Sequence, residues 1–501
     1  MVTASLHHKR SGQSTEIHEK PYYRYVKATI TYILLVVNPQ SKPIGTSSGV
    51  RADVGGDSEG QGEAKEVQVA PTLAVLMPAM KSAEPPSWPG ASWIGALDLP
   101  IELGERIKLA DSAGYRKARL LVRERTRPVA FVDVDVVDGC VDGGHLKHML
   151  STRTPSPVFP PVDPDRLPSI TVVICTRNRT SLLKTALASV LACDYDDFDV
   201  VVVDNASDDA ATVEYVESLS EPKVQVQVEP VPGLAVARNA GIRASRGNVV
   251  AFTDDDVVVD RMWLRRLGET FAADPSIGCV TGLVVPGELR TPAQDIFEKL
   301  AQKQANWSSK LTGESFHITR PPAGNPLFPF QVGLYGTGAN LALPRAVLTK
   351  LGGFDDGLGV GSPAGGGEDI DIFVRVITGG YRLVYEPAAF IWHRHYPEMS
   401  ALENEVRTYG RGLGAWMTKV ACDRVLAPMA LRRAWWAARR LLLVTSPPDV
   451  EGLDLPSGMR RKRLLGLLRG PVGYAKSRRQ GRRARPLAIN HGHTVQHEEV
   501  V

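Results

Sequence analysis

Three consecutive carboxylates, Asp254, Asp255 and Asp256, directly follow an apolar run at 249–253. Adjacent carboxylates repel one another unless a cation neutralises their charge, and Mg²⁺ and Mn²⁺ prefer oxygen ligands of this kind. The alternative is a solvated acidic turn, because aspartate is also common in turns. The position of the triplet at the end of a buried-type strand favours a divalent metal site over a turn.

Two further polar clusters follow apolar runs earlier in the chain. The residues Thr-Arg-Asn-Arg at 176–179 come after one such run, and Asp-Asn-Ala-Ser-Asp at 204–208 comes after the next. In an open parallel sheet, ligands bind beyond the carboxyl ends of the strands. Together with the acidic triplet, these clusters predict a single site for a charged ligand that forms several hydrogen bonds.

A pair of carboxylates, Glu368 and Asp369, stands between three glycines at 365–367 and a helix-like run at 370–378. Capping is one interpretation of the pair, because the exposed N–H groups and the dipole of a helix N-terminus favour negative charge. A carboxylate can also accept a proton from a reacting group as a general base. The two roles are compatible, and the residues alone leave both open.

A histidine, His393, follows a strand-like run at 389–392 and could complete a metal shell through its imidazole, which Mn²⁺ accepts. The nearby His395 keeps open the alternative that either residue is an ordinary surface histidine. The chain has no G-x-x-x-x-G-K-[ST] loop, and the glycine-rich loop at 357–361 follows no buried strand. A metal that bridges a diphosphate would serve where such a loop is missing.

Strands and helices alternate in the region that carries these clusters. Four apolar or alternating runs are separated by segments with apolar residues at helical spacing, which indicates a parallel sheet in an α/β domain. The expected strands are 170–175, 198–203, 224–228 and 249–253, and the expected helices are 182–191, 213–219 and 234–244.

Eight short blocks in this region resemble, in the same order, those of family 2 glycosyltransferases with the GT-A fold. The resemblance extends over 169–395. The blocks are VVICTRNR (172–179), VVVVDNASDD (200–209), GLAVARNAGIRASRG (233–247), VVAFTDDD (249–256), GTGAN (336–340), GGFD (352–355), GEDID (367–371) and IWHRH (391–395).

The resemblance implies a GT-A-type, Rossmann-like, mostly parallel sheet flanked by helices. It also implies transfer of a sugar from a nucleotide diphosphate sugar to an acceptor hydroxyl, with inversion at the anomeric carbon. Asp369 corresponds to the family's general base, next to Glu368. The loop at 336–340 corresponds to the acceptor side of the family's site, where close approach of the backbone to a sugar explains the glycines.

The resemblance also assigns residues to the donor. Thr176 and Asp204 are expected around the nucleotide base, and Arg238 is expected to help fix the nucleotide, with a helix-surface arginine as the alternative. Asp254 is expected near the ribose or the metal. The expected metal ligands are Asp254, Asp256 and His393, and the metal is Mn²⁺ or Mg²⁺. The family usually has an acid-x-acid pattern here, so Asp255 could share in either nucleotide or metal binding.

A long segment at 291–330 separates the donor blocks from the acceptor blocks. It contains Trp307, Phe316, Phe328 and Phe330. Two interpretations remain open for this segment, namely a lid over the acceptor and a decorated surface.

The 501 residues are 43% hydrophobic and 23% charged, which is ordinary for a globular protein and excludes wholesale disorder and a multi-pass membrane protein. We expect no signal peptide, and five cysteines without metal-ligand spacing favour the cytoplasm. We expect disorder at 1–68 and a small β-rich accessory module at 69–150, which contains a hairpin with its turn at 123–128. A linker with six prolines follows at 151–168. The catalytic domain is expected at 169–420, and a basic helical segment with a disordered tail at 421–501.

Charge is unevenly distributed along the chain. Residues 424–485 contain 16 lysine and arginine residues against three acidic residues, although the net charge of the whole chain is only +4. The run at 427–444 combines Trp435, Trp436 and leucines with arginines, as in helices that lie at a membrane interface. We weigh three interpretations: packing on the catalytic domain, peripheral attachment to an anionic membrane at its inner face, and binding of nucleic acid. The last is disfavoured because no RNA- or DNA-reading motif accompanies the charges.

Two functions from different classes therefore stand at this point. The first is a glycosyltransferase whose acceptor is a glycan, a lipid or a small molecule, in the synthesis of cell-envelope glycans, glycolipids or secondary glycosides. The alternative is a catalytically inactive protein that binds nucleotide sugars or serves as a membrane-surface scaffold. The intact carboxylates Asp254, Asp256 and Asp369 favour the enzyme.

Overall fold

The structure is a computed structural model of the 501-residue chain. The segments expected to be disordered, most of the proline-rich linker and Trp307 lie outside the residues it describes. The described residues are 75–82, 84–100, 104–151, 162–304, 309–443 and 457–481.

Four parallel strands form one half of a nine-stranded sheet, in the order β10-β7-β8-β9. Each strand except β9 is an almost completely buried run rich in valine and isoleucine, as expected for a parallel strand covered on both faces. The alternation predicted from the sequence is confirmed. The elements are β7 (Ile170–Thr176), α3 (Thr180–Leu191), β8 (Phe198–Asn205), α4 (Ala211–Ser218), β9 (Val224–Glu229), α5 (Leu234–Ala244) and β10 (Val249–Asp254).

The other half of the sheet is mixed, so the sheet as a whole is less parallel than the sequence suggested. Strand β14 is antiparallel to both β10 and β12, whereas β12 and β15 are parallel. The strand directions could not be predicted because long loops rather than single helices connect these strands. The elements are β11 (Val257–Val259), α6 (Trp263–Ala273), β12 (Ile277–Pro286), α7 (Pro292–Gln304), β13 (Glu314–Phe316), β14 (Asn340–Pro344), α8 (Arg345–Leu351), α9 (Glu368–Thr378) and β15 (Arg382–His393).

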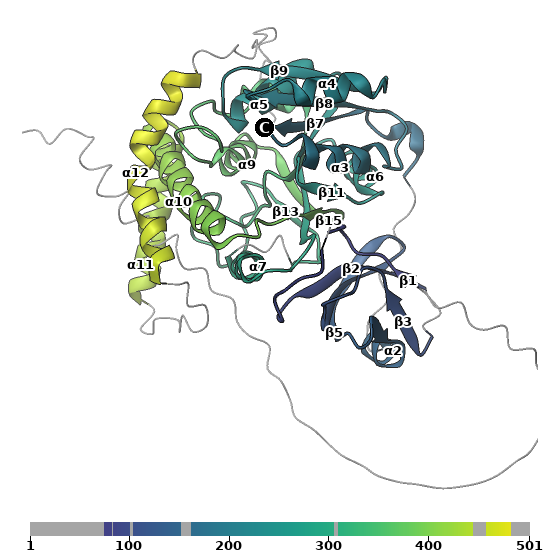
Figure 1. The fold of residues 1–501 in the computed structure, drawn as a ribbon. Helices are drawn as coiled ribbons and strands as arrows, with labels where there is room; N and C mark the ends of the chain where they lie inside the picture. The colour runs from purple at the N-terminus through teal and green to yellow at the C-terminus, as the bar shows by residue number, and fades with distance from the viewer. Residues whose placement is uncertain are drawn as a thin grey trace, which may run out of the picture.

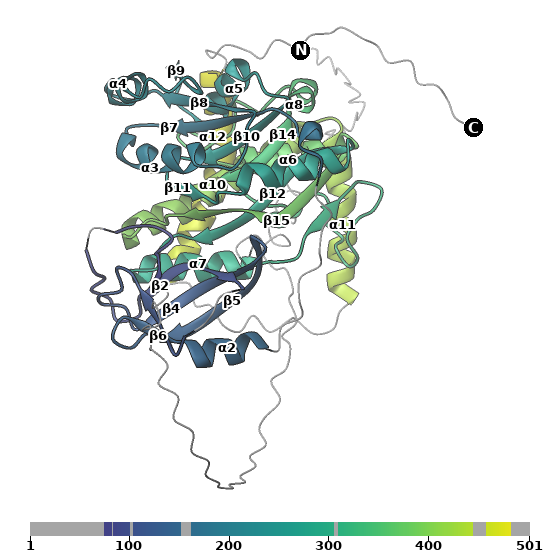
Figure 2. The ribbon, with the colours of Figure 1, turned by 90° about the vertical axis from the view of Figure 1, so that its right-hand side faces the viewer.

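Helices cover both faces of this sheet (Figures 1 and 2). Side chains of α5, α8 and α9 pack with one set of strand residues, and those of α3, α4 and α6 pack with the alternate set. Phe316, Phe328 and Phe330 are fully buried. These three aromatic residues of the 291–330 segment therefore belong to the core, and neither a lid nor a decorated surface describes them.

The described residues of the N-terminal module form two three-stranded sheets and one helix, and the module lies below the large sheet in Figure 1 and packs against it through Ile94 and Leu121. The predicted hairpin is confirmed as β4 and β5, but its turn is tighter than expected, with only Arg125 and Thr126 between the strands, both at positive φ. The elements are β1 (Val75–Leu76), β2 (Ser92–Leu99), β3 (Arg106–Leu109), β4 (Lys117–Glu124), β5 (Arg127–Asp135), β6 (Cys140–Asp142) and α2 (Gly143–Ser151).

Arg123 joins this module to the large domain. Its guanidinium pairs with the buried Asp260 and with Asp98, and it lies 5.7 Å from the centroid of the Phe390 ring. Arg127 forms a second ion pair across the boundary, 3.3 Å from Glu386. Because Asp260 is buried, removal of Arg123 would leave an uncompensated buried charge and is therefore expected to be destabilising.

Three helices follow the sheet: α10 (Met399–Cys422), α11 (Leu426–Leu443) and α12 (Ser457–Gly481). Helix α12 packs against α10 through glycines, since a Cβ at Gly470 would lie only 2.3 Å from the carbonyl carbon of Gly414, and one at Gly466 only 2.2 Å from the carbonyl oxygen of Arg407. Such close backbone approach needs small residues. Within the described residues, no helix has the length and apolarity needed to cross a bilayer.

Candidate active site

The carboxyl ends of the parallel strands place the predicted clusters at one edge of the sheet. In the strand register Thr176 lies opposite Asp204, and Asp254 lies opposite Cys175. A cavity of about 540 Å³ opens at this edge, and Thr176, Asp254 and Asp256 are among the residues that line it. The sheet thus brings residues that are far apart in the sequence to one hollow.

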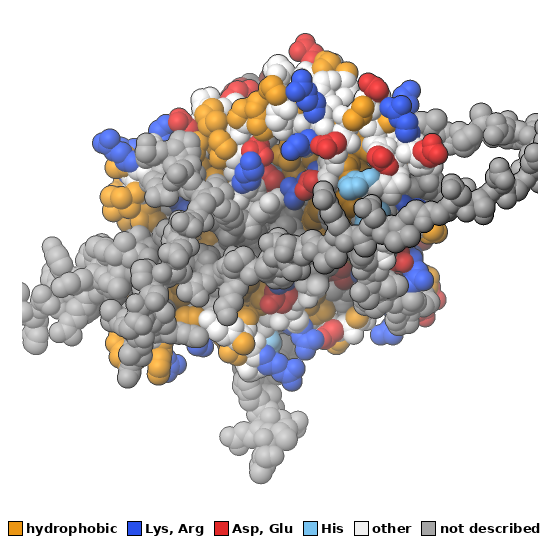
Figure 3. All heavy atoms as spheres, turned by 90° about the horizontal axis from the view of Figure 1, so that it is seen from below, with side chains coloured by type: hydrophobic (Ala, Val, Ile, Leu, Met, Phe, Trp, Pro, Cys, Tyr) orange, Lys and Arg blue, Asp and Glu red, His pale blue; other side chains and the backbone are white. Residues whose placement is uncertain are grey.

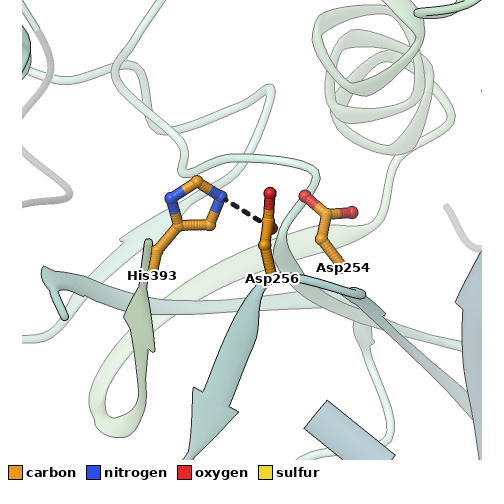
Figure 4. A group of neighbouring side chains, drawn as sticks. All are labelled: Asp254, Asp256 and His393. Atoms are coloured by element: carbon orange, nitrogen blue, oxygen red, sulfur yellow. Dashed lines mark ion pairs between the residues drawn. The ribbon is translucent and has the colours of Figure 1, made fainter. Parts of the chain in front are cut away.

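Asp254, Asp256 and His393 form a cluster at the cavity (Figure 4). Strand β10 ends at Asp254, and the next strand pairs Val257 with His393 of β15, which brings the imidazole beside the acidic turn. One donor atom from each of the three residues lies within 4.8 Å of the others, and His393 Nε2 is 3.3 Å from Asp256 Oδ1. Asp256 Oδ1 is buried and accepts no hydrogen bond. Two carboxylates and an imidazole with a buried, unsatisfied oxygen fit Mn²⁺ or Mg²⁺.

The charges of this cluster reinforce one another. Burial alone would lower the pKa of His393, but the neighbouring Asp256 carboxylate raises it to about 9. Burial likewise opposes ionisation of Asp256, yet His393 and Arg179 hold its pKa below the ordinary value. Burial raises the pKa of Asp254, against the opposing effect of Arg238. The His393 imidazole and the Asp256 carboxylate therefore each favour the charged form of the other.

Asp255 does not join this cluster. Its carboxylate accepts a 2.7 Å hydrogen bond from the Thr176 hydroxyl and pairs with Arg179 at 2.8 Å. Burial and the adjacent Asp256 raise its pKa to about 7. The middle carboxylate of the triplet therefore anchors the loop after β7, and the outer two face the imidazole.

Arg179 is a site residue that the sequence did not single out. Its guanidinium contacts both Asp255 and Asp256, the latter at 2.6 Å, and lies 5.9 Å from the centroid of the Tyr396 ring. The only signal for it was its place in the polar cluster after the first strand. Its side chain remains one-third exposed, so its positive charge faces the cavity beside the acidic cluster.

Arg238 links the acidic triplet to α9 and to the loop at 336–340. Its guanidinium is 3.1 Å from Glu368, 3.6 Å from Asp254 and 2.9 Å from the Gly338 carbonyl oxygen. It is only 2% exposed, so the alternative of a helix-surface arginine is wrong. Burial and the adjacent Asp369 raise the pKa of Glu368 to about 7 although Arg238 opposes this. Glu368 and Arg238 therefore form a buried ion pair with a structural role in the site.

Asp369 is more accessible than Glu368. It lies in the first turn of α9, where Oδ1 accepts the N–H of Ile370 at 2.7 Å and Oδ2 accepts the N–H of Gly338 at 3.1 Å. Thr337 and Ala339, on either side of Gly338, line the cavity. The predicted acceptor loop thus holds the Asp369 carboxylate, which combines capping with a position suited to proton transfer.

Asp204 is placed differently from the expectation. It is buried and accepts a hydrogen bond from the Ser207 hydroxyl, whereas its neighbour Asn205 lines the cavity. The Asn205 amide also donates to the Val231 carbonyl at 2.7 Å and accepts the Gly233 N–H at 2.8 Å. At this strand end Asn205, although itself buried, lines the cavity, and Asp204 shapes the turn.

Helix α10 supplies a wall of the cavity that no sequence motif indicated. Asn404, Glu405, Thr408 and Tyr409 all line it. The Tyr409 hydroxyl donates a 2.6 Å hydrogen bond to Glu405, whose pKa is raised by burial. Hydroxyl, amide and carboxyl groups on one wall are the groups that bind sugar hydroxyls, but their spacing in the sequence resembles that of any polar helix face.

A second buried histidine supports the first. His395 Nδ1 is 3.2 Å from His393 Nδ1, and His395 Nε2 is 3.5 Å from Glu298 of α7. Both His395 and Glu298 are buried, so His395 is not a surface histidine. The row Glu298, His395, His393 resembles the carboxylate–histidine arrangements that orient metal ligands.

Replacing His395 with phenylalanine should weaken Mn²⁺ binding by about ten- to hundredfold, the usual effect of losing a residue that orients a ligand. The ring volume is kept, but the contact with His393 Nδ1 is lost. Titration followed by the paramagnetic signal of free Mn²⁺ measures the affinity. The matched control is His145→Phe in the N-terminal module, which should leave the affinity unchanged. Equal affinities for the two variants would show that His395 does not support the site.

Comparison with known proteins places this region among glycosyltransferases. Residues 171–321 match the family described as Glycosyl transferase family 2. The pre-mycofactocin glycosyltransferase of Mycobacterium tuberculosis (strain H37Rv) is 30% identical over 259 residues, which are 51% of this chain and 48% of that protein. Poly-beta-1,6-N-acetyl-D-glucosamine synthase of Staphylococcus aureus (strain COL) is 24% identical over 234 residues, 46% of this chain and 52% of that protein. This chain spans about half the length of these curated relatives.

Among solved structures, the mannosyltransferase PcManGT from Pyrobaculum calidifontis, in complex with GDP-Man and Mn²⁺, aligns with a TM-score of 0.39. The alignment has 21% sequence identity and covers 66% of this chain and 93% of that chain.

Proposed function

We propose that the chain transfers a sugar from a nucleoside diphosphate sugar to a hydroxyl group, because residues 171–321 match the family described as Glycosyl transferase family 2. The observation that carries this proposal is the arrangement around Arg238, whose guanidinium contacts Asp254 on one side and Glu368 and the Gly338 carbonyl on the other. Arg238 thereby connects the cluster of Asp254, Asp256 and His393 with Gly338, whose N–H holds the Asp369 carboxylate.

The residues divide the work between donor and acceptor. Asp254, Asp256 and His393 would hold a divalent cation, Mn²⁺ or Mg²⁺, which when bound stabilises negative charge on the departing diphosphate. Thr176, Asn205 and Arg179 line the cavity at the ends of the parallel strands, where the nucleotide is proposed to bind. Arg179 adds a fixed positive charge beside the diphosphate position.

Asp369 takes the proton of the acceptor hydroxyl in this proposal. The Gly338 N–H holds its Oδ2, and the sugar-accepting hydroxyl approaches over the neighbouring loop. In this proposal the transfer occurs in one displacement, which inverts the anomeric carbon, with Asp369 as the base. The acceptor is proposed to be a hydroxyl of a glycan, a lipid or a small molecule, in envelope-glycan, glycolipid or glycoside synthesis.

Thermal unfolding with a panel of nucleotide sugars tests the donor part of the proposal. A ligand that binds only the folded state raises stability, by about 2.7 kcal/mol at a concentration one hundred times its Kd. We expect at least one UDP- or GDP-sugar to raise the unfolding temperature with Mn²⁺ present, and the corresponding nucleoside monophosphate to raise it much less. Stabilisation that is the same in excess chelator, or none with any donor, would contradict the proposal.

A further inference from the structure

The C-terminal helix α12 has two distinct faces. Its inner face packs against α10, where Gly466, Leu467 and Gly470 are buried at the close crossing of the two helices. Tyr474 and Arg478 extend this contact to Asp355, in the loop before α9, at 3.3 Å each. The orientation of α12 about its own axis is therefore fixed by contacts within the chain.

The outer face of α12 is apolar where it is most exposed. Leu464 is 54% exposed, Leu468 62% and Val472 59%, and these three residues recur every four positions along one side of the helix. Leu465, at 43%, widens the stripe. Large aliphatic side chains gathered in this way on a surface mark a site of interaction.

Only positive charge accompanies this stripe. Helix α12 contains eight lysine and arginine residues and no acidic residue. Arg461, Arg469, Lys476 and Arg479 are exposed around the apolar positions. By contrast, the face of the molecule seen in Figure 3 carries acidic and basic side chains interspersed. The positive charge thus coincides with the exposed aliphatic residues.

This combination favours an anionic bilayer as the occupant. A helix that lies in the plane of a membrane buries an apolar face and places basic residues beside anionic headgroups. A nucleic acid would use the arginines but would gain little from four aliphatic side chains. A second copy of α12 would bring like charges together. The neighbouring helix α11 also exposes Trp435 and Trp436, and tryptophan is enriched at membrane interfaces.

We propose that α12 docks the protein on an anionic membrane surface, with Leu464, Leu465, Leu468 and Val472 inserted among the headgroups and acyl chains. Helix α10, which α12 contacts at the glycine crossing, connects this surface to the cavity. Asn404, Glu405 and Thr408 of α10 line the cavity. The interaction depends on α12 and does not depend on sugar transfer, so it stands separately from the proposed activity.

Flotation of the full-length protein with vesicles tests this surface. We expect binding to vesicles of phosphatidylcholine with 30% phosphatidylglycerol, weak binding to pure phosphatidylcholine, and weaker binding as salt rises. The double variant Leu468→Asp/Val472→Asp should lower the partition coefficient at least about tenfold, since it removes two apolar side chains and adds two negative charges. The matched control Val137→Asp/Val228→Asp changes two similarly exposed valines elsewhere and should float like the unaltered protein.

A second double variant tests the proposal even if the two introduced aspartates disturb α12. Arg469→Gln/Lys476→Gln retains the apolar stripe and should weaken binding to anionic vesicles while leaving the unfolding temperature unchanged. The proposal would be overturned if the unaltered chain fails to float with anionic vesicles, or if both double variants float as it does. Preferential binding of a labelled duplex oligonucleotide over the vesicles would also overturn it and would assign the surface to nucleic acid.

Discussion

Replacing Asp369 with asparagine should lower the rate of sugar transfer by about a hundred- to ten-thousandfold, the usual contribution of a general base. Asparagine keeps the shape of the side chain, and its oxygen can still accept the N–H of Gly338 or Ile370. The metal cluster and the residues proposed to bind the nucleotide lie at the ends of strands, whereas Asp369 lies in α9. The affinity for the donor should therefore change little. Steady-state transfer rates and the Kd for the nucleotide sugar, measured on the same preparation, separate the two effects.

The control for this variant is Asp295→Asn. Asp295 also lies in the first turn of a helix, α7, and pairs there with Lys299 on the surface. It should therefore report what loss of a helix-terminal charge alone does to stability and activity. If Asp369→Asn weakens donor binding and turnover to the same extent, the carboxylate is a structural cap. Unchanged turnover would mean that another residue is the base.

Replacing Asp256 with asparagine should abolish metal-dependent donor binding. Asp256 is the carboxylate that contacts His393, whose Nε2 lies 3.3 Å from the buried Asp256 Oδ1. Loss of a residue that only supports a metal ligand lowers metal affinity by about ten- to hundredfold. We expect the Mn²⁺ affinity of the Asp256→Asn variant to fall by more than this. In Mn²⁺ buffer, the donor affinity should then equal that of the unaltered protein in excess chelator.

Asp255→Asn is the matched comparison, because it changes the adjacent carboxylate. Asp255 is held by Thr176 and Arg179 and is not part of the metal-type cluster. This variant should keep its Mn²⁺ affinity within a few-fold even if the loop after β7 loosens. Equal loss of Mn²⁺ from both variants would show that the triplet binds metal as a unit, contrary to the division of roles that the structure indicates.

Residues at the ends of regular strands were the ones that the sequence located well. The continuous apolar runs predicted β7, β8 and β10, and the polar residues directly after them lie where parallel strands must bring them. Asp254, Asp256 and Thr176 are therefore at the cavity. The pattern did not distinguish Asp204 from Asn205, because which of two neighbouring residues faces a ligand depends on the turn that follows.

Residues contributed by distant helices could not be located in this way. Glu298 and the cavity wall of α10 depend on tertiary packing, and their local sequence resembles that of ordinary helices. The basic tail shows the same limit. The sequence directed attention to the tryptophan-containing run at 427–444, whereas the exposed aliphatic stripe lies on α12. The inner face of α12 is also apolar, and this obscures the periodicity of the stripe in the sequence.

The release of nucleoside diphosphate from a nucleotide sugar, measured with Mn²⁺ and again with excess chelator, tests the central claim most directly. If Asp254, Asp256 and His393 form a metal site in a sugar-transferring enzyme, nucleoside diphosphate should be released from at least one donor. Acceptor hydroxyls should stimulate this release, and both chelator and the Asp256→Asn substitution should abolish it. Absence of release with every donor, or release at full rate in chelator and in the Asp256 variant, would contradict it.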